Sequence, residues 1–493
     1  TNLVTPIFDA NNDSTPLVVF SGQVTLKAMG TCAFQEAPST EITKSITKWS
    51  YCVQDVNELP YVVDKAFWLA NHKKSGAVHI DLPKCVLTSE LNDNYKEFSY
   101  KEEKKEFNYD FNQIVDIINN SNQPVLYVGK GALEASSELR DFAINANIPV
   151  TTTMHGMGVF DENHELSLEM LGMHGNYAAN HAIQNSDCII CIGARFDDRT
   201  TGNLDYYALK AKQAFKEGRG GIIHCNIEDS EINKVINSNY NFCMNSKDFI
   251  NQINTCIEYN ERNNWFKQIN DWKQKQPFKF KKSNNLKAQE VIKTLDNLID
   301  DKSKYIFTTG VGNHQMWACQ FIKWSHPKSI ISSGSLGVMG AGLPYAVGAQ
   351  IANPSKNIIL IDGDSSFNMT LTDLKTVKEH SLPIKIIIMN DGNQNMVRVW
   401  EQLFFDERIT ATKNIHNPDY YNLARSYGIN SIRCDHATNL EDSIKYFLDY
   451  KGPILLECKV ESDKCFPLNP PGKALDNMIL EDLKINMGTE IPN

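Results

Sequence analysis

Short apolar runs alternate with amphipathic stretches along most of the 493 residues. Apolar runs without an alternating polar face are typical of strands in parallel sheets that are covered on both faces. The helical stretches between them, such as 56–70, 110–120 and 368–380, would supply the crossovers. The sequence therefore predicts an α/β fold with parallel sheets, whose strands include 16–20, 78–82, 124–128, 188–192, 305–308, 356–361, 384–389 and 453–460.

Two polar stretches interrupt this alternation. Residues 94–110 are rich in Lys and Glu, residues 273–287 are rich in Asn and Lys, and neither has an apolar period. Both are typical of solvated linkers. We therefore predict three doubly wound domains and a tail, at 1–95, 111–265, 288–475 and 476–493.

The first block begins as if a domain were already under way. "TNLVTPIFDANNDSTPLVVFSGQV" predicts a helix, a turn and a buried strand, without an initiator Met or a targeting sequence. We therefore expect a preceding segment, and we expect the first domain to be incomplete.

Composition narrows the function classes. A formal charge of −10 argues against a nucleic-acid or acidic-membrane partner, and no apolar run is long enough to predict a membrane span. Twelve cysteines in a chain this long favour a reducing compartment over a disulfide framework. Cys188 and Cys191 would point to opposite faces of one strand and have no partner pair, so we expect neither zinc nor redox chemistry there.

Two acidic loops follow consecutive predicted strands. "LIDGDSSFNMT" (360–370) holds Asp364, and "MNDGNQNM" (389–396) holds Asp391. Parallel strands joined by a crossover end at the same edge of a sheet, where ligands bind. The two carboxylates can therefore converge on Mg²⁺, which prefers oxygen ligands. The alternative is that each Asp only caps a turn.

Two further motifs are candidates for cofactor contacts. "SSGSLGVMGAGLPYAVGAQ" (332–350) is glycine-rich, and "TTGVGNHQMW" (308–317) places His314 at another strand end. Close helix packing and a structural histidine are the alternatives. Because both motifs lie beside the acidic loops, we predict that their backbone approaches a cofactor.

The middle block has its own candidate site. "GARFDDRTTGN" (193–203) follows a predicted strand, and "LGMHGNYAAN" (171–180) adds His174. Arginine forks suit a diphosphate, whereas a surface salt-bridge cluster is the default interpretation. Together the two loops predict a nucleotide site that is separate from the acidic loops.

The spacing of Gly363-Asp364 and Asn390-Asp391 resembles the thiamine-diphosphate fingerprint. Nearly the whole chain resembles the catalytic large subunit of acetohydroxyacid synthase, also called acetolactate synthase. The segments that carry this resemblance are "VVFSGQV" (18–24), "GTCAFQEA" (30–37), "VHIDLPK" (78–84), "LGMHG" (171–175), "GARFDDRTTGN", "EGRGGIIH" (217–224), "GVGNHQMWACQ" (310–320), "GDSSFNMTLTDL" (363–374) and "MVRVWEQLFF" (396–405). "EGRGGIIH" is most similar to fungal mitochondrial enzymes, which implies a mitochondrial location; plastid and cytoplasm are the alternatives.

The resemblance implies a homodimer or homotetramer with pyrimidine-binding, FAD-binding and diphosphate-binding domains, and possibly a regulatory small subunit. The active site would lie at the subunit interface. The implied reaction decarboxylates pyruvate and joins the remaining two-carbon unit to a second pyruvate or to 2-ketobutyrate, an early step of branched-chain amino acid biosynthesis. Thiamine diphosphate, Mg²⁺ and FAD would be the cofactors.

The resemblance also implies roles for individual residues. The metal ligands would be Asp364, Asp391 and the carbonyl of Asn393. The contacts of thiamine diphosphate would include Val311, Gly312, Asn313, His314, Gly337, Met339, Gly363, Ser365 and Ser366. FAD would contact Gly129, Gly131, Met173, His174, Gly193, Arg195, Asp197 and Arg199. The catalytic positions would be Phe34, Gln35, Lys84, Met396 and Trp400. The family's catalytic glutamate would precede residue 1, so we expect these 493 residues alone to be inactive.

Several positions depart from the family pattern. Asp391 stands where the family has Asn, and Asn395 stands where it has Gly. In the FAD half, Asn226, Met244 and Asn245 also differ, so FAD affinity stays open. These departures leave two alternatives: a non-catalytic relative that binds thiamine diphosphate, and another 2-ketoacid decarboxylase or carboligase.

Overall fold

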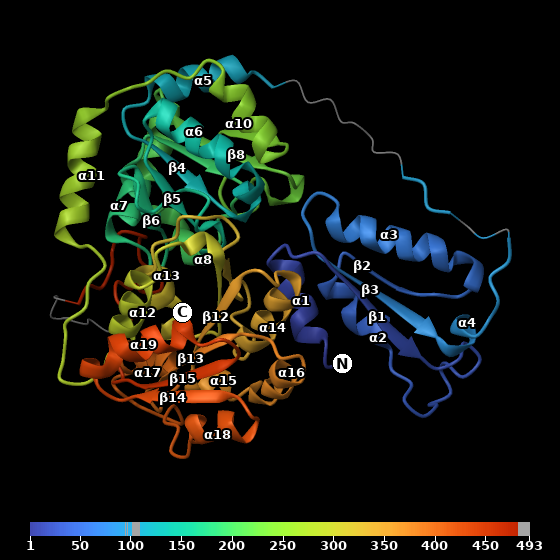
Figure 1. Cartoon of the computed structure of the whole chain (residues 1–493). Helices are drawn as coiled ribbons and strands as arrows, with labels where there is room; N and C mark the ends of the chain where they lie inside the picture. The colour runs from blue at the N-terminus through green and yellow to red at the C-terminus, as the bar shows by residue number, and fades with distance from the viewer. Residues whose placement is uncertain (94, 96, 101–108, 482–493) are drawn as a thin grey trace. The chain divides into compact units, whose positions relative to one another are not determined.

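The computed structural model describes residues 1–93, 95, 97–100 and 109–481. The chain forms two compact units. The first unit comprises Thr1–Asn108 and Ser333–Val338, and the second comprises Tyr109–Ser332 and Met339–Asn493. Figure 1 shows the N-terminal part of the first unit in blue and the second unit in cyan to red. Most of the predicted linker at 94–110 lies outside the described residues.

The first unit contains a parallel sheet of three strands in the order β1-β3-β2. Central β3 is almost wholly buried, and Val62, Ala66 and Ala70 of α3 are buried at the four-residue spacing of one helix face. The helix predicted at 56–70 is confirmed as a 3₁₀ turn followed by α3. The elements are α1 (Val4–Asn12), β1 (Leu17–Gln23), α2 (Ser39–Thr43), η1 (Lys44–Ile46), β2 (Trp49–Cys52), η2 (Val56–Glu58), α3 (Leu59–Asn71), β3 (Ala77–Pro83) and α4 (Lys84–Leu87).

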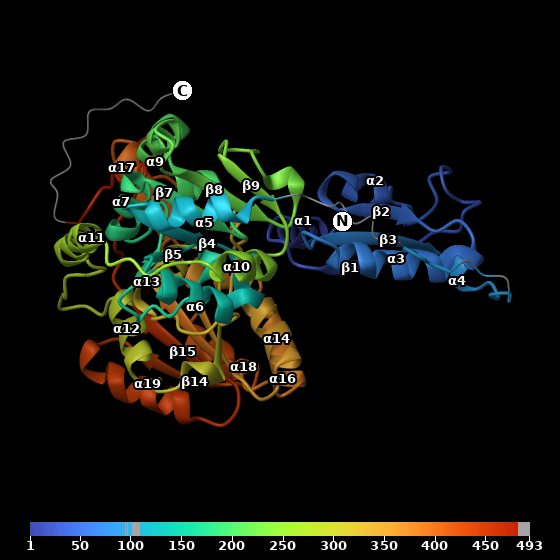
Figure 2. The same cartoon turned by 90° about the horizontal axis from the view of Figure 1, so that it is seen from above.

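The second unit contains two six-stranded parallel sheets, which Figures 1 and 2 show with helices on both sides. One has the order β6-β5-β4-β7-β8-β9. Its strands are β4 (Pro124–Val128), β5 (Val150–Thr152), β6 (Ser167–Met170), β7 (Cys188–Ile192), β8 (Gly221–Asn226) and β9 (Tyr240–Cys243). One face is covered by α5 (Phe111–Asn120), α6 (Ser136–Ala146) and α10 (Ser246–Asn254), and the other by α7 (Tyr177–Asn185), α9 (Leu209–Lys216) and α11 (Asn263–Lys275).

The other sheet has the order β11-β10-β12-β13-β15-β14. Its strands are β10 (Tyr305–Thr309), β11 (Ile330–Ile331), β12 (Asn357–Gly363), β13 (Lys385–Asn390), β14 (Asn430–Cys434) and β15 (Ile454–Lys459). One face is covered by α12 (Ala288–Asn297), α13 (Asn313–Phe321) and α19 (Leu440–Asp449), and the other by α14 (Gly342–Ala352), α16 (Leu374–Glu379) and α18 (Tyr420–Ser426).

The remaining elements of the second unit are short, apart from α17. They are η3 (Lys130–Ala135), η4 (Met154–Gly156), α8 (Asp198–Thr201), η5 (Leu204–Tyr206), η6 (Asp229–Glu231), η7 (Lys302–Lys304), α15 (Asp364–Phe367), η8 (Leu371–Asp373), α17 (Asn395–Phe404) and η9 (Ala437–Asn439).

Burial on both faces explains the uninterrupted apolar runs. In β7, Cys188 and Ile190 pack into one core cluster, whereas Ile189 and Cys191 pack into the cluster on the opposite face. The prediction that Cys188 and Cys191 point to opposite faces is therefore confirmed. No disulfide bond joins any of the twelve cysteines, all of which lie among the described residues. The predicted doubly wound α/β architecture is also confirmed.

Two local predictions were wrong. The helix expected over 368–380 begins only at Leu371, as η8 followed directly by α16, because residues 368–370 form a turn. Helix α11 continues through Lys275, into the stretch predicted as a linker. The domain boundaries remain a prediction.

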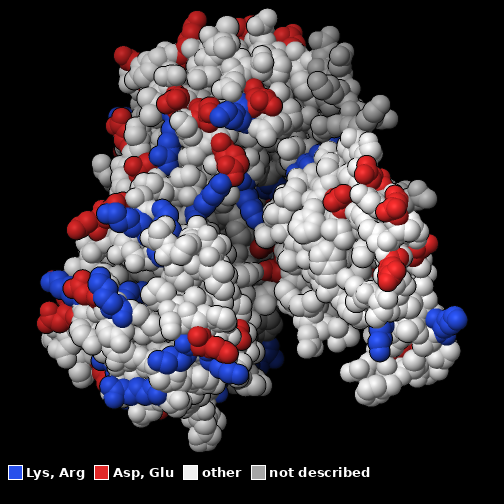
Figure 3. All heavy atoms as spheres, turned by 45° about the vertical axis from the view of Figure 1, so that its right-hand side comes forward, with Lys and Arg blue, Asp and Glu red and all other residues white. Residues whose placement is uncertain are grey.

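Acidic and basic side chains are interspersed on the face of the molecule that Figure 3 shows, rather than gathered into one large patch. Within the described part of the chain, no helix combines the length and the hydropathy that a membrane span needs.

Candidate active site

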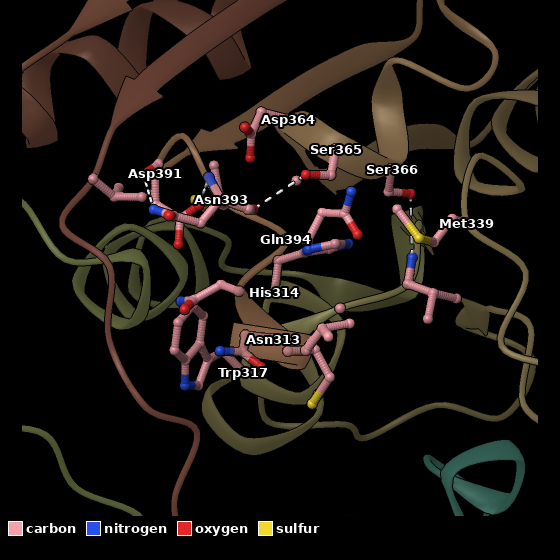
Figure 4. A pocket seen from close by; sticks show the side chains of 18 residues that line it. Asn313, His314, Trp317, Met339, Asp364, Ser365, Ser366, Asp391, Asn393 and Gln394 are labelled. Carbon is pink, nitrogen blue, oxygen red and sulfur yellow. Dashed lines mark hydrogen bonds between the residues drawn. The ribbon is translucent and has the colours of Figure 1, made fainter. Parts of the chain in front are cut away.

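The two acidic loops meet at one edge of the sheet formed by β10 to β15. Strands β12 and β13 are parallel neighbours, with Gly363 paired to Met389. Asp364 therefore follows one strand directly and Asp391 follows the next at the same edge. Figure 4 shows both carboxylates beside Asn393 in a single cavity. The predicted convergence of Asp364 and Asp391 is confirmed as geometry.

The cavity collects most of the predicted residues of this sheet. Those that line it are Val311, Gly312, Asn313, His314, Met339, Gly363, Asp364, Ser365, Ser366, Asp391, Asn393 and Met396. Residues that the sequence did not single out for the cavity are Trp317, Met389, Gln394, Asn395, Val397 and Val460. Trp400 lies further along α17, where its ring makes an edge-on contact with Phe404.

Asp364 is held by two asparagines. The side-chain amides of Asn414 and Asn417 donate to its Oδ2 at 2.8 and 2.5 Å. Asp364 is only 1% exposed, and this burial raises its pKa although the amide hydrogen bonds oppose the shift. Both amides bind the same carboxylate oxygen, Oδ2.

Asp391 is held by a backbone hydrogen bond within its own loop. Its Oδ1 accepts a hydrogen bond from the backbone N–H of Asn393 at 3.0 Å. The carbonyl oxygen of Asn393 accepts from Ser365 Oγ at 3.1 Å. Burial, together with the nearby charge of Asp364, raises the pKa of Asp391 to about 7.

These residues fit a divalent cation. Two carboxylates in one cavity, one buried and one partly buried, destabilise each other when both are charged, and a cation between them removes that cost. Carboxylate and carbonyl oxygens are also the ligands that Mg²⁺ prefers, and Mg²⁺ commonly completes its coordination with phosphate oxygens. The set contains two acidic side chains and one carbonyl. Groups of three or more His, Cys, Asp or Glu suited to a metal are absent from the described residues.

Glycines keep the neighbouring loops close together. A Cβ at Gly310 would lie 1.8 Å from Asp362 Oδ1 and 2.2 Å from Ser366 Oγ. A Cβ at Gly363 would lie 2.7 Å from His314 Nδ1. The hydroxyl of Ser366 accepts from the backbone N–H of Val311. The loops after β10 and β12 thus form a narrow backbone-lined wall, which suits a phosphate group.

His314 faces this wall from α13. It is 6% exposed, and its Nε2 lies 3.3 Å from Asp362 Oδ1. Neither His314 Nε2 nor Asp362 Oδ2 has a partner with hydrogen-bond geometry among the described residues. The expectation that His314 lies at this edge is confirmed; its role stays a prediction.

The other predicted catalytic residues lie in the first unit. Phe34 is 89% exposed, and Gln35 has a positive φ of 65°. Lys84 begins α4 and is exposed. Gly337 also belongs to the first unit and has a φ of 65°. All four residues belong to the first unit.

The predicted FAD residues gather at one edge of the sheet formed by β4 to β9. Gly129 follows β4 and Gly193 follows β7, and a Cβ at Gly129 would lie 2.5 Å from Ala194 Cα. A Cβ at Gly131 would lie 2.8 Å from Gly193 Cα. The glycines therefore let two strand-end loops touch, and Arg195 follows directly.

Met173, His174, Asp197 and Arg199 complete this edge. The backbone N–H of Met173 donates to Arg199 O at 2.7 Å. Arg199 is exposed and forms a 3.5 Å ion pair with Asp198. Asp197 caps α8 through Thr200, and burial raises its pKa. Burial lowers the pKa of His174 to about 4.

The closely packed glycine loops and the two arginines of this edge, Arg195 and Arg199, suit the diphosphate of a dinucleotide. Asn226, at the end of β8, donates its side-chain amide to Ala194 O at 3.2 Å. Asn226, which departs from the family pattern, therefore supports the loop that carries Arg195.

Sequence reasoning missed the residues that surround the acidic loops. Asn414 and Asn417 are far from Asp364 in sequence, and no motif connects them. Glu457, in β15, is 0% exposed and accepts from Asn390 at 2.8 Å. Burial alone would raise the pKa of Glu457, but hydrogen bonds from Lys459, Asn390 and Arg433 outweigh it and lower the pKa. A charged residue within an otherwise apolar strand was the available signal.

Family comparisons agree with this geometry. Residues 111–253 match the thiamine pyrophosphate enzyme central domain, and residues 310–458 match the C-terminal TPP binding domain of the same enzymes. The doubly wound sheets and the acidic strand-end site thus define a thiamine pyrophosphate enzyme.

Full-length relatives narrow this class. The chain is 41% identical to the mitochondrial acetolactate synthase catalytic subunit of Saccharomyces cerevisiae, over 98% of this chain and 73% of that protein. It is 41% identical to the mitochondrial acetolactate synthase of Schizosaccharomyces pombe, with 98% and 75% covered. The chloroplastic acetolactate synthase of Arabidopsis thaliana is 37% identical, with 98% and 73% covered. The chain belongs to the acetolactate synthase family.

Proposed function

We propose that the full-length protein is an acetolactate synthase that decarboxylates pyruvate and joins the two-carbon unit to a second pyruvate or to 2-ketobutyrate. The observation that carries this proposal is the pair of carboxylates, buried Asp364 and partly buried Asp391, at the strand-end edge of a chain 41% identical to such an enzyme.

The residues of this edge would hold Mg²⁺ and the diphosphate of the cofactor. Asp364, Asp391 and Asn393 line one cavity, and Ser365 donates a hydrogen bond to the Asn393 carbonyl. The backbone of the Gly310 and Gly363 loops would face the phosphates. Thiamine diphosphate, when bound, supplies the electron sink for decarboxylation.

Substrate positions follow from the same cavity. Met396 lines it at the start of α17, and Trp400 lies one turn further along. We assign these two side chains to the 2-ketoacid pocket, and Phe34, Gln35 and Lys84 of the first unit to the same reaction. The edge formed by Gly129, Gly193, Arg195 and Arg199 would hold FAD, which performs no net redox in this scheme.

Partners and location belong to the same proposal. The term "catalytic subunit" in the name of the yeast relative supports a regulatory subunit for this protein, and we expect a homodimer or homotetramer. The fungal relatives are named mitochondrial and the plant relative chloroplastic. The greater similarity to the fungal proteins supports a mitochondrial location.

The test is product formation by the full-length protein supplied with pyruvate, thiamine diphosphate, Mg²⁺ and FAD. Acetolactate that depends on both thiamine diphosphate and Mg²⁺ is expected. Cofactor binding without product would instead support the non-catalytic relative, and a different product from pyruvate would support another decarboxylase or carboligase.

A further inference from the structure

The side chains around Asp364 form a continuous hydrogen-bonded network that reaches far beyond the acidic motif. Asn414 and Asn417 come from the segment between α17 and α18, some fifty residues after Asp364. Both donate to the same oxygen, Oδ2. Two amide donors on one carboxylate oxygen restrict its rotation and direct Oδ1 away from them.

Asn414 is itself fixed by backbone pairing. Its N–H donates to Gly392 O at 2.8 Å, and the N–H of Gln394 donates to Thr412 O at 2.7 Å. The side-chain Nδ2 of Asn414, which donates to Asp364, also donates to Ser365 Oγ at 2.6 Å. Asn414 therefore ties together the loop that contains Asp391 and the loop that contains Asp364.

Asn417 is held from a different direction. Its amide nitrogen reaches Asn390 Oδ1 at 3.4 Å, and its Oδ1 accepts from Asn368 at 3.2 Å. Asn390 in turn donates to buried Glu457, which binds Arg433 at 2.8 Å and Lys459 at 2.7 Å. The network thus connects Asp364 to buried Glu457 and to the partly exposed cations, Arg433 and Lys459, that pair with it.

We propose that Asn414 and Asn417 are positioning residues, which orient the Asp364 carboxylate so that its Oδ1 binds a divalent cation together with Asp391 and the Asn393 carbonyl. This inference rests on the proposed cation site. Partners that orient first-shell ligands typically contribute about 10- to 100-fold to metal affinity. The two asparagines act through Asp364 and do not themselves touch the cation.

The test measures cation binding without catalysis. Mn²⁺ serves as the probe for the Mg²⁺ site and is titrated into wild-type protein and into the single variants Asn414→Ala and Asn417→Ala, with free Mn²⁺ counted by electron paramagnetic resonance. Asn163→Ala is the matched control, because Asn163 is exposed and its side chain donates to Asp161, outside the network. Asp364→Ala identifies the site.

Each of the two test variants is expected to weaken Mn²⁺ binding about 10- to 100-fold, whereas the control should change it less than about twofold. Thermal unfolding of the metal-free proteins shows that each variant is folded. A merely structural role would lower the unfolding temperature without changing the affinity of the folded protein for Mn²⁺. Each single variant removes one amide donor to Asp364 and keeps the other, so the two variants test the two asparagines separately.

Mn²⁺ affinity within about twofold of wild type in both variants would overturn the proposal, as would a wild-type protein without an Asp364-dependent Mn²⁺ site. A loss confined to one variant would overturn the role of the other asparagine. Protein that binds Mn²⁺ as expected but forms no acetolactate would count against the proposed function and leave this inference standing.

Discussion

Replacing Asp391 with Asn is the sharpest perturbation of the cation site. Partly buried Asp391 and buried Asp364 lie at adjacent strand ends, and burial with the charge of Asp364 raises the pKa of Asp391 to about 7. Asn keeps the shape of the side chain and an acceptor for the Asn393 N–H, but it removes the charge. The metal-free protein should therefore become more stable.

The size of this effect follows from linkage. Asp391 titrates near 3.8 when the chain is unfolded and near 7 when it is folded. A raised carboxyl pKa costs no stability below pH 3.8; the cost grows between pH 3.8 and 7 and is constant above that range. At pH 8 the cost is on the order of 4 kcal/mol, so Asp391→Asn should stabilise the metal-free protein by up to about that amount.

The assay is urea unfolding of the metal-free wild type and variant at pH 5 and pH 8. Asp300→Asn, an exposed carboxylate, is the control and should change stability by less than about 0.5 kcal/mol. With saturating Mg²⁺ and thiamine diphosphate, the gap between Asp391→Asn and wild type should narrow, because the cation neutralises the carboxylate pair in the wild type.

Equal stabilities of the metal-free proteins at pH 8 would refute this reasoning about charge repulsion. Thiamine diphosphate binding in the presence of Mg²⁺ should be intact or tighter in Asp391→Asn. Clear weakening of that binding would count against the cation site itself.

Three further predictions concern other parts of the molecule. Burial raises the pKa of Glu162 to about 8, so ionising this side chain destabilises the folded protein increasingly as the pH rises from 4.5 to 8. The free energy of unfolding of Glu162→Gln, measured in urea, should therefore rise relative to wild type by roughly 3 kcal/mol between pH 5 and pH 8. Parallel pH profiles of the two proteins would contradict this prediction. Gly310→Ala places a Cβ 1.8 Å from Asp362 Oδ1 and should lower unfolding free energy by about 1–3 kcal/mol together with thiamine diphosphate affinity in calorimetry; wild-type values of both would refute the close-approach argument. Trp400→Leu should lower the preference for 2-ketobutyrate over pyruvate about tenfold in a competition assay, and an unchanged product ratio would remove Trp400 from the pocket.

The sequence predicted the features that depend on local periodicity. The apolar runs predicted the parallel strands because both faces of each sheet are buried, and the order of β12 and β13 was enough to bring Asp364 and Asp391 together. The late start of the helix predicted over 368–380 was missed, since the apolar spacing of Leu371, Leu374 and Val377 carries no information about the turn at 368–370 that precedes them.

The second set of contacts at the site could not be predicted for a different reason. Asn414 and Asn417 reach Asp364 through a loop whose path depends on backbone pairing with Gly392 and Gln394. An asparagine in a polar loop gives no periodic signal, so only the fold identifies its partner. Buried Glu457 was visible as a charge within an apolar strand, but its partners come from three different elements.

The central claim is that the edge formed by Asp364 and Asp391 serves acetolactate synthesis. Its most direct test is acetolactate formation from pyruvate by the full-length protein and by its Asp364→Ala variant, with thiamine diphosphate and FAD present and Mg²⁺ added or removed by chelation. We predict product from the wild type only with Mg²⁺, and at least a hundredfold less, roughly, from the variant. Equal product from the variant, or product that is independent of Mg²⁺, would contradict the account.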